Sequence, residues 1–122
     1  MLILMLAAAA VNCANPQTQA DMTQCAGRDY AAADAAMTAQ WKTTYAYMKG
    51  RDAKNTSRGG GFGYAAALLE SQRAWLKYRD TQCVIAGGEF AGGSVQPMAV
   101  SRCREGLTKT RTAQLKSLVW SR

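Results

Sequence analysis

The chain has 122 residues, a formal net charge of +7, four cysteines and no histidine. This length allows one small domain with a thin core, because a chain of about 110 residues buries only about two thirds of the surface that it exposes when unfolded. The lack of histidine and the scatter of the eight carboxylates along the sequence argue against a base–nucleophile pair or a metal-ligand spacing. We therefore expect a protein that is not an enzyme and that needs no cofactor or metal.

The first ten residues form an uncharged apolar stretch that ends in four alanines. Such a stretch is typical of a secretory signal peptide, and Ala8 and Ala10 supply the small-residue pattern of a cleavage site. Cleavage after Ala10 would leave a mature domain of residues 11–122 without a transmembrane segment. The positive charges that normally precede the apolar run are missing, as in a sequence whose recorded start lies downstream of the true one. A buried N-terminal helix is the alternative, although the run is short and uniformly apolar.

Cys13 also follows the apolar stretch, so a lipoprotein anchored through this residue is a second interpretation. Asn12 argues against lipidation, because Gly, Ala or Ser normally precedes a lipidated cysteine. Lipidation would also leave an odd number of cysteines in an oxidising compartment. We expect a secreted or periplasmic protein.

A long first helix is predicted from Thr18 to Met48, where apolar residues recur every three or four positions with few helix breakers. Thr18 and Asp21 fit a capping box in which Asp replaces the usual Glu. The following segment, 50–63, holds Lys54, Arg58 and a run of glycines, and predicts a flexible cationic loop. No strand precedes these glycines and no Gly-Lys-Ser/Thr follows them, so they do not indicate a phosphate site.

Two further helices complete the predicted fold. The second spans about residues 64–86 and stops at Gly87-Gly88; the third starts after Ser94, a plausible N-cap, with Pro97 in its first turn. No segment has the alternating pattern of a strand. The prediction is an all-α protein, a small antiparallel three-helix bundle stapled by two disulfides.

The predicted topology brings all four cysteines to one end of the bundle. An even number of cysteines in a short exported chain indicates disulfides. We favour Cys13–Cys25 and Cys83–Cys103, because both close local loops. Pairing Cys25 with Cys83 and Cys13 with Cys103 is also geometrically open at this stage.

A spaced pattern of cysteines, aromatic residues and charges runs through the mature chain. It begins with the stretch from Cys13 to Ala26, and its centre is Gln72-x-x-Trp75-x-x-x-Arg79-Asp80-x-x-Cys83. The other positions are Tyr30, Asp34, Tyr45, Gly93, Ser94, Cys103, Thr108, Arg111 and Leu115. This pattern resembles the lysozyme inhibitor LprI-like N-terminal domain family. Asp21, Met37, Thr38 and the glycine loop depart from it.

The resemblance implies a small exported bacterial helical domain and, for the member that gave the family its name, inhibition of lysozyme. It does not by itself transfer that activity, since members of a family share a scaffold while function depends on surface sites. The shared residues Asp34, Tyr45, Gln72, Trp75, Arg79, Asp80 and Arg111 are interpreted as a structural signature.

Trp75, Arg79 and Asp80 have two possible interpretations, as a catalytic patch or as packing residues. Trp75 and Arg79 are one helical turn apart, where stacking of a cation on a ring explains both. The packing interpretation is favoured, and we predict that Arg79 pairs with a carboxylate, with Asp34 as the candidate.

The charge is unevenly distributed, since segments 49–58 and 102–122 are basic and the N-terminal part up to Asp34 is acidic. A basic face is often only a solvated surface, but it also fits an anionic cell-wall polymer or lipid headgroups. No nucleic-acid motif is present, so nucleic acid is not an expected partner.

Many lysozymes are themselves basic, so the net charge opposes contact with lysozyme. Contact would then use the acidic start of the first helix, around Asp21 and Asp29, or the glycine loop with Phe62 entering a cleft. The leading prediction is an exported, non-enzymatic, lysozyme-inhibitor-like binding protein. The alternative is an envelope-associated structural module that binds anionic cell-wall polymer.

Overall fold

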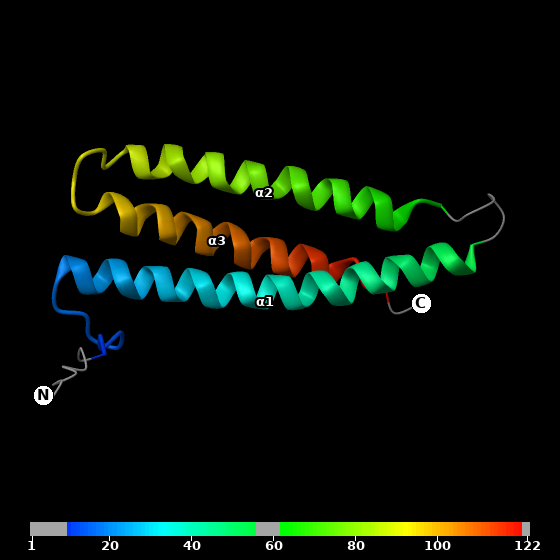
Figure 1. Ribbon diagram of the computed structural model, residues 1–122, viewed down its shortest axis with the longest axis horizontal. Coiled ribbons are helices and arrows are strands. Elements are labelled where there is room, and N and C mark those ends of the chain that lie inside the picture. The colour runs from blue at the N-terminus through cyan, green and yellow to red at the C-terminus, as the bar shows by residue number, and fades with distance from the viewer. Residues whose placement is uncertain (1–9, 56–61, 121–122) are drawn as a thin grey trace, which may run out of the picture.

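Three helices run alternately up and down in the computed structural model (Figure 1), which describes residues 10–55 and 62–120. They are α1 (Gln19–Lys54), α2 (Tyr64–Gly88) and α3 (Gln96–Ser117), and the described part of the chain contains no strand. The predicted all-α antiparallel three-helix bundle is therefore confirmed. Apart from Ala10, the predicted signal peptide lies outside the described residues.

The start of α1 follows the sequence prediction, whereas its end does not. The Thr18 hydroxyl accepts a hydrogen bond from the Asp21 backbone N–H at 3.0 Å, as expected of an N-cap. The helix continues through Gly50 to Lys54, so the prediction of a loop beginning at Gly50 was wrong. Arg51 and Asp52, in the last turn, contact residues of other segments. These contacts offset the weak helix preference of Gly50.

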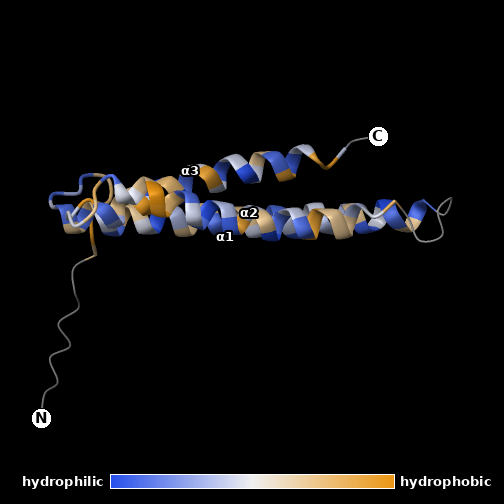
Figure 2. Cartoon of the chain, turned by 90° about the horizontal axis from the view of Figure 1, so that it is seen from above, coloured by the Kyte–Doolittle hydropathy of each residue, from blue (hydrophilic) through white to orange (hydrophobic). Residues whose placement is uncertain are grey.

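The third helix packs against both of the others, and the shared core lies between them. Viewed from above, α1 and α2 overlap, and α3 lies to one side of them along part of their length (Figure 2). Both helices continue beyond the end of α3, so one end of the bundle is a narrow two-helix projection (Figure 1).

The apolar core is small and is bordered by aromatic rings. Its buried members are Met37, Met48, Leu68 and Leu115, with partly buried side chains packed around them, including Trp41, Tyr45 and Trp75. Two threonines, Thr44 and Thr108, are completely buried at other positions facing the core. The Thr44 hydroxyl donates to the Leu115 carbonyl at 2.9 Å, so its burial leaves no unmet hydrogen bond.

Two disulfides staple the bundle at the opposite end. Cys13 is bonded to Cys25, and Cys83 is bonded to Cys103, with Cα–Cα distances of 5.5 Å in both pairs. These are the two pairings that the sequence favoured. The start of α1, the end of α2 and the start of α3 meet at this end (Figure 1). The first disulfide ties the segment before α1 to that helix, and the second joins α2 to α3.

The connection between α2 and α3 differs in detail from the prediction. Ser94 is not the N-cap of α3: Val95 holds that position in a helical conformation and provides no side-chain cap. Successive turns already curl the backbone before the helix, and the Gln96 side chain accepts a hydrogen bond from the Gly92 N–H at 3.1 Å. Pro97 lies in the first turn, as predicted.

Helix α2 ends at Gly88 instead of Ala86, and its penultimate residue packs tightly on α3. A Cβ atom placed on Gly87 would lie 2.4 Å from Cγ2 of Val100, whereas one on Gly88 would meet nothing within 4 Å. Gly87 is buried, and Val100 is branched at Cβ and cannot easily move away.

We expect Gly87→Ala to lower the free energy of unfolding by about 1–3 kcal/mol, because the added methyl group overpacks the α2–α3 contact. Gly88→Ala is the matched control. Its methyl group meets open space, and helix propensity predicts a neutral or slightly stabilising effect. Chemical denaturation of both variants measures the difference; equal stabilities would show that the two helices do not approach so closely at Gly87.

Candidate functional site

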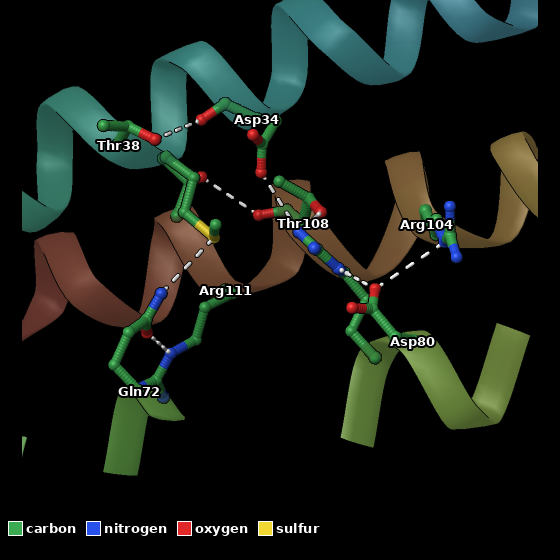
Figure 3. A network of polar contacts seen from close by, with 10 residues as sticks. Asp34, Thr38, Gln72, Asp80, Arg104, Thr108 and Arg111 are labelled. Carbon is green, nitrogen blue, oxygen red and sulfur yellow. Dashed lines mark hydrogen bonds and ion pairs between the residues drawn. The ribbon is translucent and has the colours of Figure 1, made fainter. Parts of the chain in front are cut away.

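A polar network that includes Asp34, Asp80 and Thr108 joins the three helices (Figure 3), and Arg79 contacts all three of these residues. Its guanidinium group donates to Asp34 of α1 at 3.1 Å, to Asp80 of α2 at 3.0 Å and to Thr108 of α3 at 3.4 Å. Burial opposes the charge of Arg79, but the hydrogen bonds to these carboxylates outweigh it and raise its pKa. The ion pair predicted between Arg79 and Asp34 is present.

A second arginine extends this network along the bundle. Arg111 donates to Gln72 at 2.9 Å and to Ser71 at 3.2 Å, and Gln72 in turn contacts the sulfur of Met37 at 3.7 Å. Trp75 lies between the two arginines: its ring centroid is 5.4 Å from the guanidinium carbon of Arg79 and 5.9 Å from that of Arg111. Burial lowers the pKa of Arg111.

These contacts place most of the signature residues in one interhelical network, and Tyr45 packs at the edge of the apolar core against Trp41. The buried guanidinium groups of Arg79 and Arg111 donate to other residues of the same network. In the described residues 10–55 and 62–120, no group of three or more His, Cys, Asp or Glu side chains could hold a metal ion. The arrangement supports a role in joining the helices. A candidate binding site is therefore expected among exposed side chains outside this network.

The three residues predicted to contact a partner do not form one site. Asp21 lies in the first turn of α1, two turns before Asp29 on the same helix. Asp29 is neutralised by Arg102 of α3, with 2.7 Å between the carboxylate and the guanidinium nitrogen. Phe62 lies at the other end of the bundle, where its ring is 4.6 Å from that of Tyr64. The acidic contact surface expected around Asp29 is thus partly occupied by an internal ion pair.

The structure instead gathers aromatic and cationic residues at the two-helix end. The guanidinium carbon of Arg51 lies 4.7 Å from the ring centroid of Trp120, 5.7 Å from that of Tyr64 and 5.9 Å from that of Tyr47. The Tyr47 hydroxyl donates to the Trp120 carbonyl at 2.5 Å. A pocket of about 410 Å³ opens here. Its lining residues are Tyr47, Arg51, Lys54, Asn55 and Tyr64. We call Tyr47, Arg51, Lys54, Phe62, Tyr64 and Trp120 the end cluster.

Asp52 holds the start of α2 against the end of α1. Its carboxylate accepts hydrogen bonds from the backbone N–H groups of Gly63, Tyr64 and Ala65, each at 3.0 Å. Gly63 has a positive φ of 97° and offers no side chain as a cap, so a carboxylate from the preceding helix replaces the usual N-cap. These backbone donors, the one from Ala65 above all, lower the pKa of Asp52.

We expect Asp52→Asn to lower the melting temperature at pH 7 by several degrees, because the amide is a weaker acceptor for the helix N-terminus. The pKa of Asp52 is lowered in the folded state, so its contribution is present above the unfolded value of 3.8 and is lost as the pH falls through the folded value. Thermal melts of both proteins at several pH values should therefore converge at low pH. A constant difference between pH 7 and pH 2 would contradict this assignment.

Part of the end cluster was visible in the sequence and part was not. Segment 49–58 was recognised as basic, and Tyr47 and Arg51 have the i, i+4 spacing of helical neighbours. Nothing local links Trp120, close to the end of the chain, to either of them. The antiparallel topology alone brings the segment after α3 back to this end of α1.

The fold and the site define a class of protein: a disulfide-stapled domain of three helices with a cationic, aromatic end. The family of lysozyme inhibitor LprI matches residues 11–115, and the chain belongs to this family. It is also 41% identical over 111 residues to an uncharacterized protein of Rhizobium meliloti (strain 1021), a match that covers 90% of this chain and 80% of that protein. No solved structure matches the chain.

None of the three helices, within residues 10–55 and 62–120, combines the length and the apolar character that crossing a bilayer demands.

Proposed function

We propose that this chain is an exported binding protein without enzymatic activity of its own that inhibits a lysozyme. The observation that carries the proposal is the family match over residues 11–115, which covers α1, α2, nearly all of α3 and both disulfides. The two disulfides fit an oxidising compartment outside the cytoplasm, and a signal peptide over residues 1–10 would deliver the domain of residues 11–122 there.

We further propose that the end cluster is the contact surface. Its residue types, Trp, Tyr and Arg, are those that most often dominate protein interfaces. Phe62 and Trp120 are 55% and 38% exposed, so rings of the cluster are accessible to a partner. The cluster lies on the narrow part of the bundle, where α1 and α2 extend beyond α3 (Figure 1). A narrow projection suits a concave target such as an active-site cleft.

The charge of this end fits the cleft of a lysozyme better than the net charge of the two proteins suggests. Lysozymes cleave their substrate with a pair of carboxyl groups that flank the scissile bond. Arg51 and Lys54 would bring positive charge to those groups, and the aromatic rings would occupy the apolar surface that receives the sugar. The cluster would thereby exclude the substrate and engage the catalytic carboxyl groups at the same time.

The acidic alternative is less well supported. Asp29 is already paired with Arg102, and Asp34 and Asp80 are engaged by Arg79. An acidic surface on α1 would have to compete with these internal partners for a lysozyme's basic groups. Phe62 therefore remains a proposed contact residue, and Asp21 and Asp29 are less favoured as contacts.

Inhibition is tested with purified protein against lysozymes of different classes, by following the lysis of cell-wall substrate. We expect Lys54→Glu to weaken inhibition about tenfold or more, because the reversed charge would face the carboxyl groups of the cleft. Lys42→Glu, an equal charge change at an exposed position of α1 away from the end cluster, is the control and should inhibit like the unchanged protein. Equal inhibition by both variants would remove the end cluster as the contact surface.

The second candidate function, binding of an anionic envelope polymer, is favoured by the net charge of +7. The two candidates differ in their response to salt. Salt screens the long-range repulsion between two basic proteins, so association with lysozyme should become faster between low and physiological ionic strength. A complex with an anionic polymer should instead be released over the same range. If the protein inhibits no class of lysozyme and retains cell-wall fragments in a salt-sensitive way, the first candidate function is wrong and the second is supported.

A further inference from the structure

One side of α2 carries a regular stripe of uncharged residues that stay exposed beside the other helices. The stripe follows the spacing 4-3-4-3-4, and all of its members are exposed. They are Ala67, Ser71, Ala74, Tyr78, Thr81 and Ile85. The buried residues of α2 lie on other positions, Leu68, Gln72, Arg79 and Cys83 among them. An alternation of four and three is the seam of a coiled coil, and here the seam is exposed.

The large residues of this seam are unusually exposed for a small protein. Tyr78 is 52% and Ile85 is 70% exposed, and the neighbouring Val84 and Phe90 are 64% and 42% exposed. Exposed apolar side chains that share one helix face, as Tyr78 and Ile85 do, mark an interaction site more often than isolated apolar residues do. Of the three hydroxyl groups of the seam, two already have partners within the chain: Thr81 donates to the Lys77 carbonyl at 2.7 Å, and Ser71 accepts from Arg111, which lowers the cost of burying them.

The order of residue sizes along the seam identifies its occupant. The first half holds the small residues Ala67, Ser71 and Ala74, and the second half holds Tyr78, Thr81 and Ile85. If two copies of α2 pack antiparallel about a twofold axis near residue 76, each layer combines one residue from each half. The layers are Ala67 with Ile85, Ser71 with Thr81, and Ala74 with Tyr78. Every larger side chain then faces a smaller one, as close helix packing requires.

We infer that two copies of this chain pair through α2 in this antiparallel register. The seam is about 27 Å long at 1.5 Å per residue, which gives an interface at the small end of specific contacts, below about 1,200 Å² in total. The positive charge of both copies also opposes pairing. The dimer is therefore weak, with a dissociation constant of about 10–100 μM at physiological salt, and it strengthens as salt rises. It places the two end clusters at opposite ends of the assembly.

Two alanine positions of α2 test the seam by sedimentation equilibrium up to about 1 mM protein. Ala74→Glu introduces a charge opposite Tyr78 of the second copy and should leave a monomer. Ala66→Glu adds the same charge to an exposed position of α2 outside the seam and should leave the dimer intact. Helical circular dichroism and melting of both variants verify that the fold is retained. A monomeric unchanged protein at 1 mM, or dimers of equal strength in both variants, would overturn the inference.

The register has a test of its own. Lys77 flanks the seam and would lie close to Lys77 of the second copy, so each wild-type dimer brings two like charges together. A mixture of the unchanged protein with Lys77→Glu should form the mixed dimer in preference to either homodimer. Random mixing would overturn the antiparallel register. Reduced lysozyme inhibition by Ala74→Glu, in a protein that is monomeric without the substitution, would assign this face to lysozyme instead of a second copy.

Discussion

Arg79→Ala is expected to lower the free energy of unfolding by about 3 kcal/mol, because it removes a buried side chain that joins the three helices. Arg79 is 6% exposed and connects a residue on each of the three helices. Removing it leaves Asp34 and Asp80 without their shared cation and opens a space beneath Trp75 and Tyr30, whose ring centroids both lie 5.4 Å from the guanidinium carbon. The cost comes mainly from the lost interhelical packing and from the lost hydrogen bond to Thr108, because Asp34 and Asp80 are themselves 43% and 50% exposed and regain water.

Arg104→Ala is the matched control for this prediction. Arg104 contacts the same carboxylate, Asp80, at 3.6 Å, and its ring contact with Tyr30 is similar, but its side chain is 34% exposed. An ion pair that water reaches contributes about 0–1 kcal/mol. Urea denaturation of the two variants should therefore separate them clearly. Similar stabilities would mean that the network around Arg79 adds little beyond a surface ion pair.

Replacing both cysteines of the Cys83–Cys103 disulfide with alanine is expected to cost about 3 kcal/mol or more. The bond closes a loop with a sequence separation of 20, and the chain-entropy relation gives about 3 kcal/mol for a loop of this size. Cys83 is completely buried between α2 and α3, so its removal also leaves unfilled space. For a domain with so thin a core, this is a large part of a typical stability of about 5–15 kcal/mol.

The Cys13–Cys25 disulfide offers a comparison within the same molecule. Its sequence separation of 12 predicts nearly the same entropic term. However, Cys13 is exposed and precedes the helices, and this segment contacts α1 through few groups, such as the Val11 carbonyl at 3.3 Å from Arg28. Once uncrosslinked, the segment detaches without unfolding the bundle, so most of that entropy is regained in the native state. Calorimetry should show a much smaller decrease for this pair, and equal decreases would contradict the local detachment.

Local information in the sequence was sufficient for the helices and for the sulfur pairs. The spacing of apolar residues places α1, α2 and α3, and the Thr18 cap and Pro97 mark two of their starts because capping depends on neighbouring residues alone. Local loop closure favoured the disulfides that the structure contains. The pair between Arg79 and Asp34 was also foreseen, since a buried arginine needs a carboxylate and few were available.

The tertiary structure decided what depends on contacts between distant residues. Gly50 is helical because Arg51 and Asp52 find partners on other segments, and Ser94 is not a cap because the turns before α3 already follow helical geometry. The end cluster forms because the antiparallel topology returns Trp120 to Arg51, across a separation along the chain at which local propensity carries no information. The sequence alone thus determined the elements and their staples, whereas packing determined the surface that the bundle offers to a partner.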